Sequence, residues 1–593
     1  MSRLLRVLIV IAFCPAILAG RQSAPAPPAA QKVSREWKRL DAPGLVVVGN
    51  ARGEDLRRTA ESILRFRLAM RSLLPFLRTD PPAPTVAVVF RDDSAMTPFK
   101  PRDRGKPMDL VAAYFSPQPD VNYIVMSIGR REFTYRVVFH EYTHLLVNQN
   151  ISRLPHWLSE GLAEFFSTFD GSEQDGRLIL GRPLEEETSW LVGSNSPFPM
   201  RQFIDPAAMR ELYRDRTLTS RFYAQSWALV HYLMLGDNGA HRAALGTFMA
   251  ALQGGDPAPE VFKRVFGQDL SGLDRALVQY IGMMKMPAIQ VNQPPVTISA
   301  DVTPMLEVDA EQLQGDLQVR SGALKEAARH LAKAETTDPM HVATRLSRVR
   351  SLIAEDRGTD ALDVLNAPDI AAREDFPAVF LRAQAEWAAR HFEPAESAYR
   401  RAVALRPDFA FAYYGLTLAQ LALGRPETSA TFARVLALMP GADWYHRRLL
   451  DSQRIGVDQF AIADAMNYVE QSGWNDTSPY AMFVAALAYD RRKQPDKAQE
   501  VLEAIRAHVP GTSWQAAVAL FLEGKLAPAA LIAKASSPGL LTEAHAYIGI
   551  KASIDGDRAL AQPHLEWVRD NGARDYTEYG LALGELDRLA RPK

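Results

Sequence analysis

The sequence predicts an α+β domain with a small N-terminal sheet and several helices, followed by an all-α domain of repeated helical pairs. Short apolar runs typical of strands are confined to about the first 130 residues, and longer helical patterns follow them. Beyond residue 300, small and apolar residues recur in steps of 34 positions, the length of a two-helix repeat. A chain of 593 residues is long enough for several domains, each with a core of its own.

The overall charge gives no sign of a polyanionic partner. The chain has 68 basic and 69 acidic side chains, so its formal charge is −1. A protein that binds nucleic acid or an anionic membrane surface usually carries an excess of Lys and Arg. We therefore expect no nucleic-acid partner.

The N-terminal residues have the order of a secretory signal peptide. Basic residues in Met1–Arg6 precede the apolar run Val7–Ala19, and a segment rich in Pro and Ala follows. We expect residues 1–19 to be cleaved, residues 20–35 to form a flexible tether, and the protein to be periplasmic or secreted. An uncleaved anchor is the alternative, although the apolar run is short for a membrane span, and no transmembrane domain is expected after cleavage. The only cysteine, Cys14, lies within this run, so the mature chain would contain no disulfide.

The first folded domain is expected over residues 36–286, and the proline-rich residues 287–300 are expected to form a linker. Buried apolar runs predict strands, and apolar residues at a period of 3.6 predict helices. The strands are expected at 45–48, 85–90 and 121–126, and the helices at 55–76, 133–148, 156–168 and 222–235.

Internal periodicity marks residues 301–593 as the second domain. One set of small, apolar and proline residues recurs two 34-residue steps later, and its first copy is Ala327, Leu331, Ala334 and Pro339. The pattern resembles the tetratricopeptide repeat (TPR), in which small residues let two helices approach closely and a proline ends the second helix. The resemblance implies a solenoid whose extended surface binds a protein partner. The alternative is an irregular helical domain with coincidental alanines.

A His-Glu-x-x-His motif lies within the apolar segment 137–147. On a helix, His140 and His144 are one turn apart and project from the same face, so both imidazoles can reach one metal ion. Glu141 sits beside them, placed to take a proton from metal-bound water. The alternative is a polar stripe that faces solvent, but such stripes are usually built from Lys, Glu and Arg, and this one holds no basic pair.

A catalytic zinc site needs a third protein ligand and an open position for water. Sixteen residues after His144, in the segment Pro155–Phe166, Glu160 can supply that ligand. If the segment is helical, Glu164 lies one turn further on the same face, where it can accept a hydrogen bond from a ligand histidine, His140 being the candidate. Carboxylates that face inward on so apolar a helix would be costly without a metal or a donor.

The His-Glu-x-x-His motif followed by Trp157–Glu164 resembles the gluzincin metallopeptidases, the clan of thermolysin and the aminopeptidase N family, and most closely their peptidase MA-like branch. The resemblance covers residues 36–285 and is most specific around the motifs. It implies a zincin-like fold, one zinc ion per chain, Glu160 as the third ligand and Glu164 as the support of a histidine. The loop between His144 and Glu160 is shorter than in the well-studied members, so the details of their substrate cleft are not carried over.

The reaction implied by the resemblance is zinc-promoted hydrolysis of a peptide bond. Glu141 would accept a proton from the zinc-bound water and return it to the departing amine. Tyr223 is the candidate donor to the developing oxyanion, with a role in core packing as the alternative. His231 is expected to be a core histidine, and His156 to help start its helix rather than to bind the metal.

The strand predicted at 121–126 precedes the metal-binding helix, and the resemblance implies that such a strand forms a sheet edge on which an extended peptide lies. The expected function is an exported zinc metallopeptidase that acts on a peptide or protein, with repeats that hold the substrate or a partner. The alternative is a catalytically inactive peptidase-like scaffold whose repeats mediate protein–protein interaction.

Overall fold

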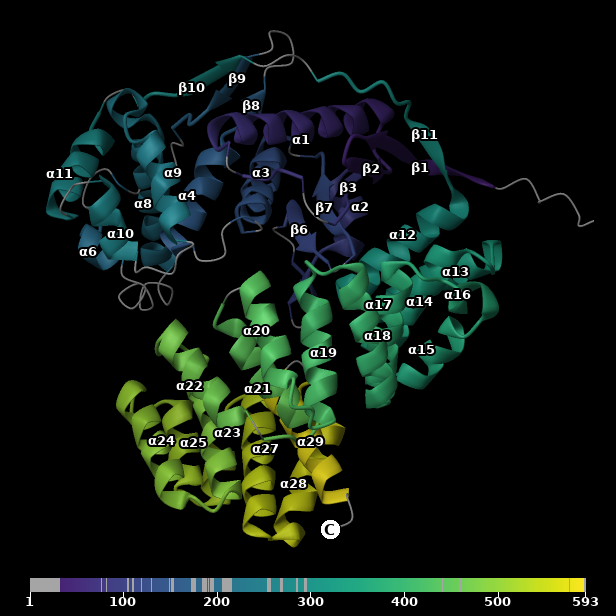
Figure 1. Cartoon of the computed structure of the whole chain (residues 1–593), viewed down its shortest axis with the longest axis vertical. Helices are drawn as coiled ribbons and strands as arrows, with labels where there is room; N and C mark the ends of the chain where they lie inside the picture. The colour runs from purple at the N-terminus through teal and green to yellow at the C-terminus, as the bar shows by residue number, and fades with distance from the viewer. Residues whose placement is uncertain are drawn as a thin grey trace, which may run out of the picture.

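The computed structural model shows an N-terminal region of sheets and helices and a C-terminal region of helices only (Figure 1). This is the α+β organisation followed by an all-helical region that the sequence predicts. The residues described are 32–75, 77–80, 83–103, 106–108, 111–118, 120–129, 131–148, 150, 154–171, 177–183, 189, 191, 197–204, 216–252, 258–266, 270–283, 286–292, 296–439, 441–458, 460–574 and 576–590.

A six-stranded sheet forms the centre of the N-terminal region, with the strand order β11-β1-β2-β3-β7-β6. Its strands are β1 (Val33–Ala42), β2 (Leu45–Gly49), β3 (Thr85–Phe90), β6 (Ala113–Pro117), β7 (Asn122–Ser127) and β11 (Thr303–Leu306). The central strands β2, β3 and β7 are parallel, and the outer strands run antiparallel to their neighbours. The strands predicted at 45–48, 85–90 and 121–126 agree with β2, β3 and β7 to within one residue.

The prediction that residues 121–126 form a sheet edge is wrong. Strand β7 lies inside the sheet, between β3 and β6. Its backbone pairs with both neighbours, so it has no free side for an added peptide strand. All six of its residues are buried, which is typical of a strand covered on both faces. The edge at this end of the sheet is β6.

Helices cover both faces of the sheet. The alternation of side chains in β3 shows the two sides, because Ala87 and Val89 join one hydrophobic cluster and Val88 and Phe90 join the other. The first face packs on α1 (Gly53–Leu73) and α3 (Arg131–Asn148), and the second on α2 (Asp93–Met96), the 3-10 helix η1 (Thr97–Phe99) and α12 (Glu307–Arg320). In Figure 1, α1 lies lengthwise above α3.

The remaining N-terminal elements extend the cluster on the first face. The helices are α4 (His156–Ser167), α6 (Met200–Phe203), α8 (Arg216–Leu235), η3 (Gly236–Gly239), α9 (Arg242–Leu252), α10 (Ala258–Phe266) and α11 (Leu270–Ile281). Three strands, β8 (Asp170–Gly171), β9 (Arg177–Leu180) and β10 (Ile289–Asn292), form a second sheet, and β4 (Arg102–Asp103) pairs with β5 (Lys106–Pro107). The predicted helices at 55–76, 133–148, 156–168 and 222–235 correspond to α1, α3, α4 and α8.

Strand pairing continues through and beyond the predicted linker at 287–300. Within it, β10 pairs with β9, and directly after it β11 pairs with β1 at the edge of the main sheet. The helix that follows, α12, packs Leu313 and Leu317 onto the sheet. The first helix of the C-terminal region therefore completes the N-terminal core.

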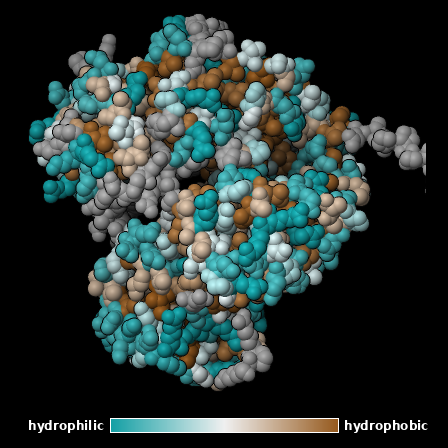
Figure 2. Space-filling model, viewed as in Figure 1, coloured by the Kyte–Doolittle hydropathy of each residue, from teal (hydrophilic) through white to brown (hydrophobic). Residues whose placement is uncertain are grey.

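From α12 onward, consecutive helices pack on one another and form an arc below the sheet (Figure 1). They are α13 (Leu324–Thr337), α14 (Val342–Ala354), α15 (Gly358–Leu365), α16 (Pro368–Ala371), α17 (Phe376–Ala388), α18 (Phe392–Leu405), α19 (Ala410–Ala422), α20 (Thr428–Leu438), α21 (Asp443–Arg454), α22 (Ala461–Ser472), α23 (Ser478–Arg491), α24 (Pro495–His508), α25 (Trp514–Leu522), α26 (Pro528–Lys534), α27 (Pro538–Asp555), α28 (Arg558–Asn571) and α29 (Thr577–Ala590). On the face shown in Figure 2, hydrophilic residues predominate over this arc, with hydrophobic residues scattered among them.

The periodic small and apolar residues lie where neighbouring helices meet. Ala327, Leu331 and Ala334 are all buried on α13. Opposite them on α12, a Cβ at Gly315 would lie 2.6 Å from Cδ2 of Leu331. The repeated spacing therefore reflects close contact between adjacent helices.

The described helices include none that is both long and apolar enough to cross a bilayer. The predicted signal peptide, residues 1–19, and most of the predicted tether lie outside the described residues. The last three tether residues, 33–35, belong to β1.

Helix α4 packs closely on α8 at Gly161. A Cβ at this position would lie 2.3 Å from the backbone oxygen of Ser226 and 2.6 Å from Cγ2 of Val230. The backbone oxygen of a residue within a helix cannot move aside as a flexible side chain can. This position therefore requires a residue without a Cβ. This contact holds α4 against the core.

Gly161→Ala should lower the free energy of unfolding by about 1–3 kcal/mol, because the added methyl group overpacks the contact between α4 and α8. Urea unfolding followed by circular dichroism measures the change. Gly511→Ala is the matched control, because a Cβ at Gly511 meets no atom within 4 Å. An equal loss of stability in both variants would show that the contact is not as tight as described.

Candidate metal centre

Three side chains from two packed helices meet at one point. His140 and His144 come from α3, and Glu160 comes from the first half of α4. The two helices lie side by side in the core, where Phe139 and Leu162 belong to the same hydrophobic cluster. The imidazoles are half-buried, and the carboxylate is buried.

The inner atoms of these three side chains form a nearly equilateral triangle. Nε2 of His140 lies 3.2 Å from Nε2 of His144, and Oε2 of Glu160 lies 3.5 Å and 3.4 Å from these two nitrogens. A tetrahedral ion with bonds of about 2.0–2.1 Å requires ligand atoms about 3.3–3.4 Å apart. The triangle therefore has the size of one face of a tetrahedral zinc site.

The outer nitrogens of both histidines have hydrogen-bond partners. Nδ1 of His140 lies 3.3 Å from Oε1 of Glu164, and Nδ1 of His144 lies 3.0 Å from Oγ of Ser159. When each Nδ1–H donates to its oxygen, each Nε2 keeps a free lone pair that faces the centre of the triangle. The donor set then presents two nitrogen lone pairs and one carboxylate oxygen to a single point, an arrangement that fits a divalent cation.

The charges at this point favour a cation. Burial alone would lower the pKa of His140, but the carboxylates of Glu160 and Glu164 outweigh it and raise the pKa to about 10. Burial would raise the pKa of Glu160, but hydrogen bonds from the two histidines lower it to about 2. Both shifts show that a positive charge is stabilised between these groups, and a metal ion can take the place of that proton.

Two further side chains surround the cluster. Arg136 lies one turn before His140 on α3, and its Nη2 is 3.8 Å from Oε2 of Glu164. His156, the first residue of α4, lies with Nδ1 3.6 Å from Oε1 of Glu160 and stacks on the ring of Phe222. Burial lowers the pKa of His156, so its imidazole is neutral at pH 7. His156 thus begins its helix, as predicted, and also lies beside the candidate ligand.

The predicted base and oxyanion donor lie near the cluster. Glu141 is half-buried beside His140 on α3. Tyr223 of α8 is also half-buried, and the charges of Glu160, Glu164 and Glu141 act on its hydroxyl. Burial together with these carboxylates raises the pKa of Tyr223 to about 12, so at neutral pH its hydroxyl is protonated and can donate a hydrogen bond.

His231 is a core histidine, as predicted. It is fully buried, and its two ring nitrogens lie 2.7 Å from the hydroxyl of Tyr280 and 2.7 Å from the backbone oxygen of Gly181. Burial lowers its pKa to about 4. With both nitrogens in hydrogen bonds, His231 takes no part in the metal centre.

Sequence reasoning missed Ser159 and Arg136. Arg136 could have been found, because it lies four residues before His140 and so on the same helical face. Ser159 gives no such signal, because its role depends on how α4 packs across α3. Its contact with His144 becomes visible only in three dimensions.

Residues 136–248 match a family described as "Protein of unknown function (DUF1570)". The matched segment contains α4, α8 and the part of α3 from Arg136 onward, and therefore every residue of the candidate metal centre. A search of the curated proteins finds no match to the chain.

Proposed function

We propose that the chain is a zinc metallopeptidase of the gluzincin type that hydrolyses peptide bonds. One observation carries this proposal: His140, His144 and Glu160 present three lone pairs at tetrahedral spacing. His140, His144 and Glu160 would hold one zinc ion, which when bound lowers the pKa of a water molecule and polarises a carbonyl.

Each of the surrounding residues has a separate role in the proposed reaction. Glu141 takes the proton of the attacking water on its carboxylate and delivers it to the nitrogen of the departing amine. Tyr223 donates its hydroxyl proton in a hydrogen bond to the substrate oxygen as negative charge develops there. Glu164 and Ser159 hold the outer nitrogens of the two histidines and so fix the direction of the inner ones.

The proposed fold is a zincin-like domain followed by a TPR-like solenoid. The zincin-like assignment is supported by a small mixed sheet with a His-Glu-x-x-His helix on one face and a second helix that supplies a glutamate. The TPR-like assignment is supported by consecutive packed helices with small residues buried between them. In this proposal the helical region holds the protein substrate or a partner.

Export remains part of the proposal and rests on residues 1–19 of the sequence. The second candidate function is an inactive peptidase-like scaffold whose helical region mediates protein–protein interaction. The two candidates differ in one respect that can be measured, because only the first requires turnover at the metal centre.

The purified protein should contain one zinc ion per chain and should hydrolyse members of a broad library of quenched fluorescent peptides. Glu141→Gln should keep the zinc and reduce kcat by about 10²–10⁴, because the proton acceptor is lost while the ligands remain. Metal analysis and initial rates measure both quantities. Stoichiometric zinc without hydrolysis of any peptide would favour the scaffold, and unchanged hydrolysis by Glu141→Gln would refute the role given to Glu141.

The two glutamates of α4 should behave differently when each is replaced by alanine. Glu160→Ala should lose the metal, because it removes a ligand, whereas Glu164→Ala should bind zinc about 10–100 times more weakly, because it frees the ring of His140. Competition with a zinc chelator of known affinity gives both dissociation constants. The reverse order would show that Glu164 is the ligand.

Tyr223→Phe should lower kcat by about 10²–10³ with little change in KM or zinc content, because the lost hydrogen bond forms only as the oxyanion develops. Steady-state kinetics separates the two constants. Tyr232→Phe is the control on the same helix, because the hydroxyl of Tyr232 lies 3.2 Å from Asp237, beyond the C-terminal end of α8. Equal rates for both variants would assign Tyr223 to packing.

A further inference from the structure

A cluster of four charges joins the main sheet to the helical region, and of its members Asp316 is buried while Asp120, Arg320 and Arg350 are half-buried. Asp120, in the turn between β6 and β7, accepts hydrogen bonds from Arg320 of α12 and Arg350 of α14. Asp316 of α12 accepts from the same two arginines, with 2.6 Å to Nε of Arg320 and 3.1 Å to Nη1 of Arg350, and from Ser347. Two carboxylates therefore neutralise two guanidinium groups, and the cluster has no net charge.

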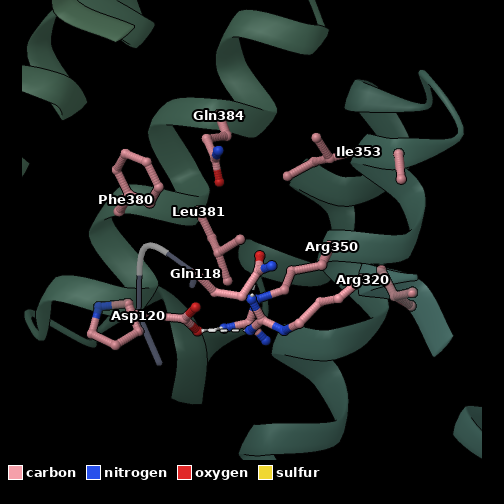
Figure 3. A pocket seen from close by; sticks show the side chains of 11 residues that line it. Gln118, Asp120, Arg320, Arg350, Ile353, Phe380, Leu381 and Gln384 are labelled. Carbon is pink, nitrogen blue, oxygen red and sulfur yellow. Dashed lines mark hydrogen bonds and ion pairs between the residues drawn. The ribbon is translucent and has the colours of Figure 1, made fainter. Parts of the chain in front are cut away.

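A cavity of about 230 Å³ opens above this cluster, between α14 and α17 (Figure 3). Arg320, Arg350, Asp120 and Gln118 form its floor. Its walls are mostly apolar and consist of Val319, Ile353, Ala354, Pro377, Phe380 and Leu381. On the opposite side, the side chain of Gln384 points toward the cavity in Figure 3, and no described residue hydrogen-bonds to its amide.

The cavity is one of three that share lining residues in series between α12 and α29. A second, of about 290 Å³, shares Ile353 and Gln384 with the first. A third, of about 520 Å³, shares Asp356, Arg390 and Arg454 with the second and reaches α28 and α29. We call the three together the junction groove. It begins at the turn that ends the edge strand β6.

We propose that the junction groove binds an extended segment of a protein and that the first cavity takes one uncharged apolar side chain of that segment. The proposal rests on the role in holding a protein that is proposed above for the helical region. It does not rest on hydrolysis at the metal centre.

The size of the cavity favours one side chain over a small molecule. Sites for small molecules usually measure about 300–1,000 Å³ and enclose most of their ligand, whereas this cavity is smaller and shares lining residues with the second cavity. A chain of connected cavities suits a linear polymer. The free amide of Gln384 offers one donor and one acceptor, which is what the backbone of an extended peptide requires.

The charges of the groove favour a segment without a large net charge. The floor of the first cavity holds Asp120 and two arginines, and Asp316, which does not line the cavity but pairs with both arginines, balances the remaining charge. The other two cavities are lined by four arginines and four acidic residues, namely Arg390, Arg454, Arg558, Arg569, Asp356, Asp451, Glu566 and Asp587. Because the charges of the floor and of Asp316 already pair with one another, a charged side chain placed in the first cavity would find no free opposite charge on the floor, and its burial there would be costly. We therefore expect the side chain in the first cavity to be that of phenylalanine or leucine.

Disulfide tethering tests the proposal, because the chain has only one cysteine, Cys14. In a full-length Cys14→Ser background, Ala354→Cys places a thiol at the wall of the first cavity. The probes are thiol-bearing peptides, Gly-Ser-Xaa-Ser-Gly with a cysteamine end, in which Xaa is Phe, Leu, Ala, Asp or Lys. Under a reducing buffer, mass spectrometry should show at least tenfold more protein linked to the Phe and Leu peptides than to the other three.

Two matched variants test whether the preference for the Phe and Leu peptides depends on the first cavity. Ala430→Cys, on an exposed helical position that lines none of the three cavities, should show no preference among the peptides. Adding Ile353→Trp to Ala354→Cys should fill the cavity and abolish the preference, with an unchanged circular dichroism spectrum. Equal linkage of all peptides at both thiols, a preference for Asp or Lys, or a preference that survives Ile353→Trp would overturn the proposal. Because tethering measures binding and not turnover, its result is independent of the zinc and hydrolysis experiments.

Discussion

The buried carboxylate of Glu160 is the constraint on which the arrangement of the N-terminal region depends. An isolated carboxylate at this depth would be strongly destabilising, since removing a charge from water costs several kcal/mol. The two imidazoles that α3 places within 3.5 Å of it offset this cost. That placement in turn requires α4 to lie tightly between α3 and α8, which the absence of a side chain at Gly161 permits. The packing of α4 and the geometry of the candidate metal centre thus depend on each other.

The local pattern of the sequence is enough to predict the helices of the candidate metal centre. The apolar surroundings of His140 and His144 predict a buried helix. The segment around Glu160, which follows after one short loop, is apolar in the same way and predicts a second buried helix. The pairing of Glu164 with His140 follows from helical periodicity. These predictions succeed because each depends on residues at most a few helical turns apart.

Features set by distant parts of the chain were not predictable in the same way. Strand β11 joins β1 across more than 260 residues, and no local pattern indicates that pairing. The misplaced edge at β7 has a different cause. Its run of consecutive apolar residues is typical of an internal strand, whereas the resemblance to related folds implies an edge, and here the local pattern agrees with the structure. The contact between Ser159 and His144 likewise depends on how two helices face each other.

The same long-range pairing joins the N-terminal region to the helical region. Because α12 belongs to the core of the sheet and also begins the helical arc, the two regions share one hydrophobic cluster. The ion pairs of Asp120 and Asp316 reinforce this junction at the turn between β6 and β7. A protein held in the arc would therefore lie at a fixed position relative to the sheet and to α3, the helix of the candidate metal centre.

The central claim is that His140, His144 and Glu160 form a metal site. Its most direct test is a crystal structure of the protein purified with zinc, with diffraction data collected on both sides of the zinc absorption edge. We predict one anomalous peak bonded to Nε2 of both histidines and to the carboxylate of Glu160, at about 2.0–2.2 Å from each. The absence of a peak at this position, or a zinc peak bound only to other residues, would contradict the account.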